Sequence, residues 1–224
     1  MANMRRTKTA LLASALLTLA LPAVAPAKLT EIGVIGVTNP ATVASCPASP
    51  CLAVSRTTGF QVKVATVRNP MGVPRSGTIV AWTITLGKPN ATQIKYFNAN
   101  EGGVAEAGIA ILRPQPKPNL TYKLIAQSPL LKLAPYFGKT AQFPLETTIP
   151  VKKGDEIALT VPTWAPALAL GFGNDTSWRA SRPKKQCTST NMQTAHTQLN
   201  ASVQYFCLYQ TARLTYSTTL ISTP

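Results

Sequence analysis

The chain has 224 residues, with 22 Lys or Arg, 7 Asp or Glu and a single histidine. A chain of this length forms one domain, or one domain with an extended arm, and can bury a substantial core. Scarce carboxylates and a single histidine disfavour the common hydrolytic mechanisms, which need paired acids or a histidine base. The formal net charge of +15 favours partners that carry negative charge.

Residues 1–27 have the pattern of a secretory signal peptide. A basic start is followed by an apolar run over 10–21 and by Ala25-Pro26-Ala27, a typical cleavage sequence. The run is shorter than the ~20 residues needed to span a bilayer as a helix. We therefore expect cleavage before Lys28, a secreted or cell-envelope location, and no membrane span after cleavage. The mature chain keeps 19 basic and 7 acidic residues, a net charge of +12.

Four cysteines in an exported chain predict disulfides. Three connectivities are possible, and the simplest pairs Cys46 with Cys51 and Cys187 with Cys207. Closing the longer loop would stabilise the fold by about 3 kcal/mol in the chain-entropy model. The spacings do not fit a zinc site, and His196 is the only histidine, so we expect no metal and no cofactor. His196 lies in a polar stretch and is predicted to be an exposed loop residue.

The mature sequence alternates apolar and polar residues with a period of two, which is typical of β-strands. Phe60, Val62 and Val64 are predicted to face the core, with Gln61 on the opposite face. No sustained helical period appears, and 19 prolines separate many short segments, so we predict an antiparallel β-sandwich. The predicted strands are 60–64, 77–87, 120–126, 157–161, 203–207 and 211–221, and the predicted loops are 88–108, 114–118 and 181–199.

A strand–turn–strand pattern covers 149–159, with the sequence Ile-Pro-Val-Lys-Lys-Gly-Asp-Glu-Ile-Ala-Leu. Gly154 can supply a positive φ, and Asp155 can cap the turn through its carboxylate. This pattern resembles the turn of many jelly-roll β-sandwich domains. From residue 75 to the C-terminus, the chain also resembles a group of uncharacterised exported bacterial proteins. The resemblance rests on Ser-Gly-Thr-Ile-Val-Ala-Trp, the Gly-Asp turn and a closing Thr-Ala-Arg-Leu-Thr-Tyr, and it implies a jelly-roll-like sandwich without a function.

The predicted organisation has three parts. Residues 1–27 are the signal peptide, 28–57 are an N-terminal extension that contains the small disulfide loop, and 58–224 are the β-sandwich domain. Within the extension, 32–37 has the composition of an edge strand that packs on the sandwich.

Two basic stretches are the candidate binding residues. Four positive charges fall within 179–185, directly after Trp178, and a second pair lies at the Gly-Asp turn. If both stretches share one end of the sandwich, they form a site for carbohydrate or an anionic cell-envelope polymer. Nucleic acid is disfavoured, because the chain lacks both interleaved aromatic and basic residues and a recognition helix. The residues of this predicted site are Trp178, Arg179, Arg182, Lys184, Lys185, Lys152 and Lys153.

Aromatic residues support a related hypothesis. Trp164 and Trp178 lie near predicted strand ends, where exposed rings can stack on sugars, although simple packing is the alternative; Trp82, in mid-strand, is predicted to be core.

We therefore predict a secreted, non-catalytic binding or cell-envelope module, with no catalytic residue assigned. Two alternatives stay open: a structural extracellular protein that pairs through sheet edges, and a hydrolase whose acids converge only in three dimensions. The oligomeric state is open.

Overall fold

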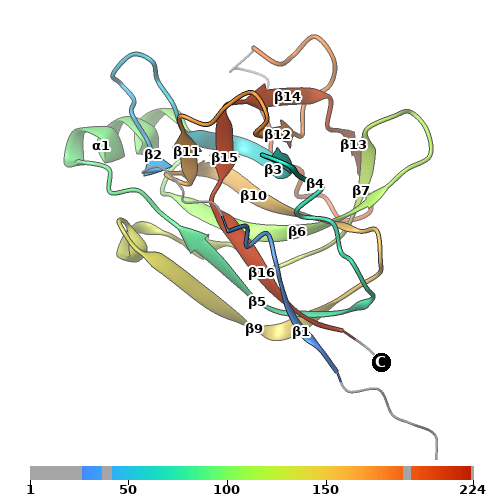
Figure 1. Ribbon diagram of the computed structural model, residues 1–224. Helices are drawn as coiled ribbons and strands as arrows, with labels where there is room; N and C mark the ends of the chain where they lie inside the picture. The colour runs from blue at the N-terminus through green and yellow to red at the C-terminus, as the bar shows by residue number, and fades with distance from the viewer. Residues whose placement is uncertain (1–26, 37–41, 189–192, 223–224) are drawn as a thin grey trace, which may run out of the picture.

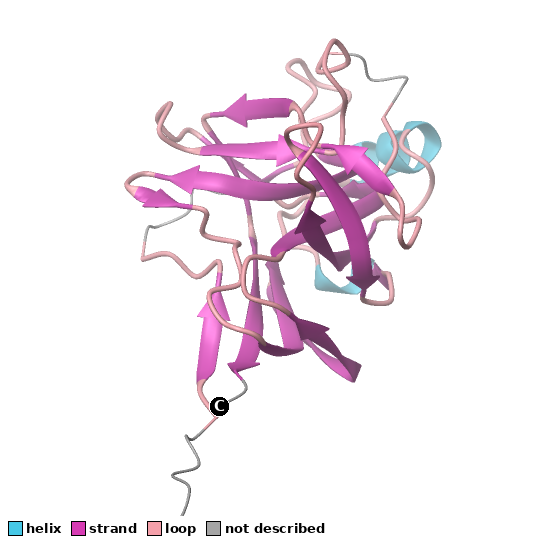
Figure 2. Ribbon diagram, turned by 90° about the vertical axis from the view of Figure 1, so that its right-hand side faces the viewer, coloured by secondary structure: helices cyan, strands magenta, loops and turns pink. Residues whose placement is uncertain are grey.

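A computed structural model describes residues 27–36, 42–188 and 193–222. Within these residues the chain is almost entirely strand and loop, in antiparallel sheets (Figure 2). The predicted all-β sandwich is therefore confirmed. The predicted signal peptide lies, apart from its last residue, outside the described part of the chain. No helix of the described residues is long and apolar enough to cross a membrane.

The strands range from 2 to 12 residues in length. In chain order the elements are β1 (Leu29–Ile32), β2 (Thr42–Val43), β3 (Val54–Val64), β4 (Val67–Arg68), β5 (Gly77–Thr85), α1 (Ala91–Asn100), β6 (Glu106–Pro114), β7 (Thr121–Gln127), β8 (Leu131–Lys132), η1 (Ala134–Tyr136), β9 (Thr140–Val151), β10 (Glu156–Ala165), β11 (Leu168–Leu170), β12 (Ser177–Ala180), β13 (Ser202–Gln204), β14 (Cys207–Gln210), β15 (Ala212–Leu214) and β16 (Tyr216–Ser222).

The strand pairing is that of a jelly roll. β1 pairs with β16, β3 with β10, β5 with β9 and β6 with β7, all antiparallel. Each pair is nested inside the previous one along the sequence, as in a long hairpin rolled into two sheets. One sheet has the order β1-β16-β5-β9, and the other contains β7-β6-β10-β3. Figure 1 shows them as two layers, with β5, β9 and β16 below β3, β6 and β10.

Residues 166–215, between β10 and β16, are an insertion into this plan. They add β12 and β14 beside β3, and β13 beside β7. Two further strands of the insertion, β11 and β15, pair with each other, and β2 joins them in a three-stranded sheet. The insertion forms the top of the molecule in Figure 1. It contains the basic stretch 179–185 and the longer disulfide, and so it carries most of the predicted site.

The insertion covers the second face of the larger sheet. Tyr205 is fully buried, and its ring lies 5.5 Å from that of Phe60 and 5.3 Å from that of Tyr122. Gln61, predicted to face outward, is buried on the other face of β3. Its amide donates to the Ala212 carbonyl at 3.2 Å and accepts from the Leu214 amide at 3.0 Å. The prediction for Gln61 was wrong because both faces of β3 are covered.

The predicted loop over 88–108 contains helix α1. Asn90 and Gln93 form a reciprocal capping box: Asn90 Oδ1 accepts from the Gln93 amide at 2.9 Å, and Gln93 Oε1 accepts from the Asn90 amide at 2.8 Å. Phe97 is the one buried residue of the helix, stacked on Trp164 with ring centroids 4.6 Å apart. A helix with a single buried residue has no apolar stripe, and so periodicity did not reveal it.

The closing segment 211–221 is two strands instead of the predicted one. The chain leaves the three-stranded sheet after β15 and enters the four-stranded sheet at β16. Thr215 makes this crossing: its amide donates to the Ala167 carbonyl at 3.1 Å and its hydroxyl to the Thr85 carbonyl at 2.7 Å. At the other terminus, the edge strand is β1, which ends at Ile32, so the prediction of a strand over 32–37 was wrong in its position. Residues 33–36 are not strand, and residue 37 lies outside the described part of the chain.

The Gly-Asp turn has the predicted geometry. Gly154 has a φ of +87°, and Asp155 Oδ2 accepts from the Lys152 amide at 2.9 Å. The buried Asp155 carboxylate also accepts two hydrogen bonds from the Arg113 guanidinium, at 2.8 and 2.9 Å. This bidentate pair ties the turn to β6.

Replacing Asp155 with Asn should lower the free energy of unfolding by about 2–3 kcal/mol, because charge-assisted hydrogen bonds to a buried group are lost. Urea unfolding monitored by circular dichroism measures the change. Asp175→Asn, at an exposed position, is the matched control and should stay within about 0.5 kcal/mol of the parent. Equal stability of the two variants would show that the Arg113–Asp155 pair does not hold the turn.

Candidate functional site

The insertion and the segment after the small disulfide loop enclose a cavity of about 440 Å³. It opens among β11, β12, β14 and the start of β3, in the upper part of Figure 1. We call it the Arg182 pocket. Its apolar walls include Leu52, Ala53, Leu168 and Leu170, and its polar walls include Trp178, Arg182 and Tyr209.

Arg182 is the charged group of the pocket, and only 8% of it is exposed. Nη1 donates to the Cys187 carbonyl at 3.2 Å and to the Tyr209 hydroxyl at 2.8 Å, and the guanidinium carbon lies 5.6 Å from the Tyr209 ring centroid. Burial lowers the pKa of Arg182, but an arginine in a protein keeps its proton. No carboxylate of the described residues forms an ion pair with it. Arg182 is therefore a buried cation whose acceptors are neutral, an arrangement that is costly without an anion.

Two donors on the pocket walls lack acceptors. Arg182 Nε and Trp178 Nε1 are both buried, and neither has a hydrogen-bond partner among the described residues. A buried donor without an acceptor costs about 1–3 kcal/mol. Because both side chains line the cavity, an acceptor that enters it can relieve this cost after a small side-chain adjustment.

Trp178 is 6% exposed, so simple packing, the alternative that the sequence left open, is correct, and the ring is not an open aromatic platform. Its ring packs on Tyr209, the residue opposite it on β14, with centroids 4.8 Å apart. The sequence makes room for it at Gly59, where an added Cβ would lie 2.8 Å from the indole ring. Trp164, the other predicted platform, is fully buried, and its Nε1 donates to Asn98 Oδ1 at 3.0 Å.

Both disulfides have the local pairing that the sequence favoured, and the smaller one borders the pocket. Cys51 is a wall residue. The Cys187 carbonyl accepts from Arg182 and also from the Tyr209 hydroxyl, at 2.7 Å. The bond from Cys187 to Cys207 ties this carbonyl to β14, and so it holds the arginine in place.

The remaining residues of the basic stretch lie elsewhere. Arg179 is partly buried, and Nη1 donates to the Phe206 carbonyl at 2.6 Å, which fixes the link between β13 and β14. Lys184 and Lys185 are exposed, with Lys184 Nζ 5.7 Å from the Phe206 ring centroid. Of the predicted site residues, only Trp178 and Arg182 line the pocket.

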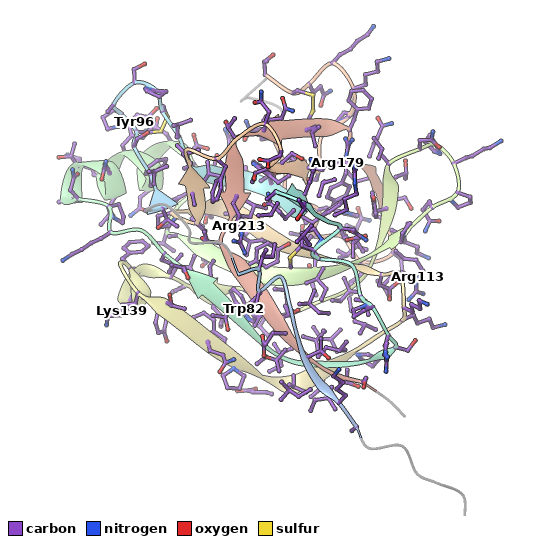
Figure 3. The ribbon with its side chains drawn as sticks, viewed as in Figure 1. Trp82, Tyr96, Arg113, Lys139, Arg179 and Arg213 are labelled. Atoms are coloured by element: carbon purple, nitrogen blue, oxygen red, sulfur yellow. A yellow bond between two sulfur atoms is a disulfide. The ribbon has the colours of Figure 1, made fainter. Side chains whose placement is uncertain are left out.

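The two basic stretches lie beyond opposite ends of β3. Gly59 pairs with Leu159 of β10 on one side and with Ala180 of β12 on the other, both antiparallel, so β10 and β12 run in the same direction. The Lys152-Lys153 turn precedes β10, whereas Arg182 to Lys185 follow β12. In Figure 3, Arg113, which holds the turn, lies at the right, and Arg179 of β12 lies higher in the molecule. The condition for one joint basic site is not met.

His196 is 3% exposed, which contradicts the predicted exposed position. Its ring nitrogens lie 3.1 Å from the Tyr205 hydroxyl and 3.1 Å from the Ala201 carbonyl. The carbonyl only accepts, so Nε2 carries the proton and Nδ1 accepts from Tyr205. Burial lowers the pKa of His196 below 6.5. The neutral ring belongs to the core beneath the insertion, and its contribution to stability is lost as the pH falls below the unfolded-state value.

Glu156 is buried at the start of β10, and its Oε2 has no hydrogen-bond partner among the described residues. Burial raises its pKa to about 7; a hydrogen bond from Asn69 opposes this shift, and the Asp155 carboxylate adds to it. Neither Glu156 nor Asp155 lines the Arg182 pocket. These adjacent acids therefore do not flank that cavity as a hydrolytic pair would.

The Arg182 pocket offers a positive charge and unpaired donors, and no carboxylate of the described residues lines it. No cluster of three or more His, Cys, Asp or Glu in the described residues is placed to hold a metal ion. Comparison with protein-family models, curated proteins and solved structures found no match to this chain. The sequence singled out Trp178 and Arg182, but it gave no signal for Tyr209 or for the apolar wall, which meet only through the insertion.

Replacing Cys187 and Cys207 with Ser should lower the free energy of unfolding by about 3 kcal/mol, because the unfolded chain regains the entropy of an open loop. The same change should release the Cys187 carbonyl and shift the Trp178 indole NMR signal. The Cys46→Ser/Cys51→Ser variant, which opens a loop with a sequence separation of 5 instead of 20, is the control and should lose less. Equal losses in the two variants would contradict this explanation.

Replacing Glu156 with Gln should change how stability depends on pH. The unfolded carboxyl loses its proton near pH 4.5 and the folded one near pH 7, so the stability that Glu156 contributes is complete below pH 4.5 and is lost as the pH rises through 7. The Gln variant does not titrate. Its stability relative to the parent should therefore increase by about 3 kcal/mol across this interval. Urea unfolding of both proteins over a pH series tests this, because the effect of His196 is common to both. A stability difference between variant and parent that does not vary with pH would refute the prediction.

Proposed function

We propose that this protein is an exported, non-catalytic binding protein, and that the Arg182 pocket holds a small ligand with one anionic group on an apolar body. One observation carries the proposal: Arg182, a buried cation without a counter-ion, lies on a cavity wall, and its Nε and the Trp178 Nε1 are buried donors that have no acceptor among the described residues. A carboxylate supplies the missing charge and the missing acceptors together.

The rest of the pocket defines the ligand's body. Leu52, Leu168 and Leu170 offer apolar contact on the walls of the same cavity. A volume of about 440 Å³ falls within the range of ordinary ligand sites, about 300–1,000 Å³. One buried guanidinium matches one negative charge, so an aliphatic or aromatic monocarboxylate is the ligand class that we propose.

Export is part of the proposal and rests on two observations. The sequence of residues 1–27 has the order of a signal peptide. Two disulfides are also typical of oxidising compartments outside the cytoplasm. The net positive charge would raise the local concentration of anionic ligands.

The polymer-binding hypothesis is supported by fewer exposed positive charges than the sequence suggested. Lys184 and Lys185 remain exposed in the same stretch, whereas Arg179 and Arg182 donate to backbone carbonyls. A polyanion or acidic polysaccharide would therefore meet two lysines there instead of four free cations. This hypothesis predicts steep salt dependence, which a pocket with a single charge does not.

Isothermal titration of the exported protein, with both disulfides intact, tests these alternatives. Octanoate and 4-phenylbutyrate should bind, and the matched amides should bind about 10- to 100-fold more weakly, because charge-assisted hydrogen bonds are lost. Arg182→Gln should reduce carboxylate binding to the level of the amides, and the exposed Lys185→Gln should not change it. Ala53→Leu, which fills the cavity and leaves Arg182 in place, should also block binding.

Heparin at low and physiological salt serves as the polyanion probe. Two results together would replace the pocket proposal with the polymer hypothesis. Heparin binding would depend steeply on salt and be lost in Lys184→Gln/Lys185→Gln, and the acids and the amides would bind equally well.

A further inference from the structure

A second cleft, of about 480 Å³, lies between β9 of the four-stranded sheet and the segment that follows β7. We call it the Trp82 cleft, and the residues of its wall that matter here are Trp82, Gln127, Glu146, Thr147, Thr148 and Pro150. In Figure 3 Trp82 lies in the lower layer, whereas Arg179, beside the Arg182 pocket, lies in the upper part of the molecule. The two cavities share no wall residue.

β9 departs from regular pairing where it borders this cleft. Pro144 pairs with Ala81 and Ile149 with Ile79, so residues 145–148 have no partner residue on β5. β9 is also the edge strand of its sheet. Pro144 and Pro150 lack an amide N–H, which makes this edge a poor template for adding another strand. The bulge therefore favours a ligand that contacts side chains over a partner that extends the sheet.

Trp82 contributes a donor with no acceptor. The residue is fully buried, and its Nε1 has no hydrogen-bond partner among the described residues. Phe143 packs on its ring, with centroids 4.9 Å apart, and keeps it in place. Buried indole N–H groups nearly always have an acceptor, and a ligand in the cleft can supply one to Trp82 after a small side-chain adjustment.

The polar groups of the wall select the ligand class. Trp82 and the Gln127 amide donate, Glu146 accepts, and the Thr147 and Thr148 hydroxyls do both. The side chains of Gln127, Thr147 and Thr148 make no hydrogen bond with any described residue. Among the described residues that line the cleft, none is Lys, Arg or His, so an anion finds no counter-charge there.

We infer that the Trp82 cleft binds a short, uncharged saccharide. Sugar hydroxyls both donate and accept, which matches the mixed wall, and the apolar face of a sugar ring can pack on Pro129 and Pro150. The volume suits a small ligand of one or two rings. This site is independent of the Arg182 pocket in its residues, its charge and its place in the fold.

The three tryptophans of the chain allow a direct test by ¹H–¹⁵N NMR of the indole N–H groups. Trp82 reports on the cleft, Trp178 on the Arg182 pocket, and Trp164, which donates to Asn98 and to the Gly103 carbonyl, is the internal reference. Cellobiose, maltose and N,N'-diacetylchitobiose at millimolar concentration are the probes. At least one of them should shift the Trp82 signal and leave the other two in place, whereas octanoate should shift Trp178 alone. Failure of one proposal is thus distinguishable from failure of the other.

Substitutions on the exposed wall then tie the signal to the cleft. Thr147→Val and Gln127→Ala should each weaken saccharide binding by roughly 3- to 10-fold, the effect of one lost hydrogen bond. Thr92→Val, at an exposed position on helix α1, should leave it unchanged. The inference is wrong if none of the three sugars moves the Trp82 signal, or if the double variant Thr147→Val/Gln127→Ala binds as tightly as the parent.

Discussion

Strand β10 is buried on both faces, and each face of such a strand needs its own covering layer. The four-stranded sheet covers one face, where the Tyr216 hydroxyl donates to the Ile157 carbonyl at 2.8 Å. On the other face, Thr160 accepts from the Thr58 hydroxyl at 3.2 Å, and Thr58 in turn accepts from the His196 amide at 2.9 Å. The insertion 166–215 is therefore part of the core as well as the carrier of a site.

The Arg182 pocket forms because the insertion 166–215 covers the larger sheet. The insertion returns to the sheet through β12 and β14, and it meets the segment that leaves the small disulfide loop. Where these three pieces of chain join, the packing leaves a cavity. The side chains around it come from positions that are far apart in the sequence, and the longer disulfide keeps two of the pieces together.

Arginine has an unexpected role in this strongly basic chain. With only seven acids available, backbone carbonyls serve as acceptors for partly or fully buried guanidinium groups: Phe206 for Arg179, Cys187 for Arg182 and Gly33 for Arg213. These arginines tie loops to the sandwich. Positive charge in the sequence thus overstates the positive charge that is free to bind a polyanion, and the Arg182 pocket contains a single charged residue among those described.

Local pattern was enough to predict part of this structure. Period-two alternation predicts strands because successive side chains of a strand point to opposite faces, and the Gly-Asp turn follows from what Gly154 and Asp155 can do in their own backbone. The disulfides join nearby cysteines, so spacing favoured the correct pairing. The one helix had a local signal in the capping residues Asn90 and Gln93, but its apolar periodicity was too weak to support a prediction.

What the sequence determined by itself is the sandwich, its jelly-roll turn and its two local disulfides, because each depends on residues that are neighbours in the chain. Only the tertiary structure decided that Trp178, Arg182 and His196 are buried and that Lys152 and Lys153 lie at the far end of β3. Burial depends on which segment covers which face. Here the covering segment is a long insertion whose path is set by contacts between residues that are distant in the sequence.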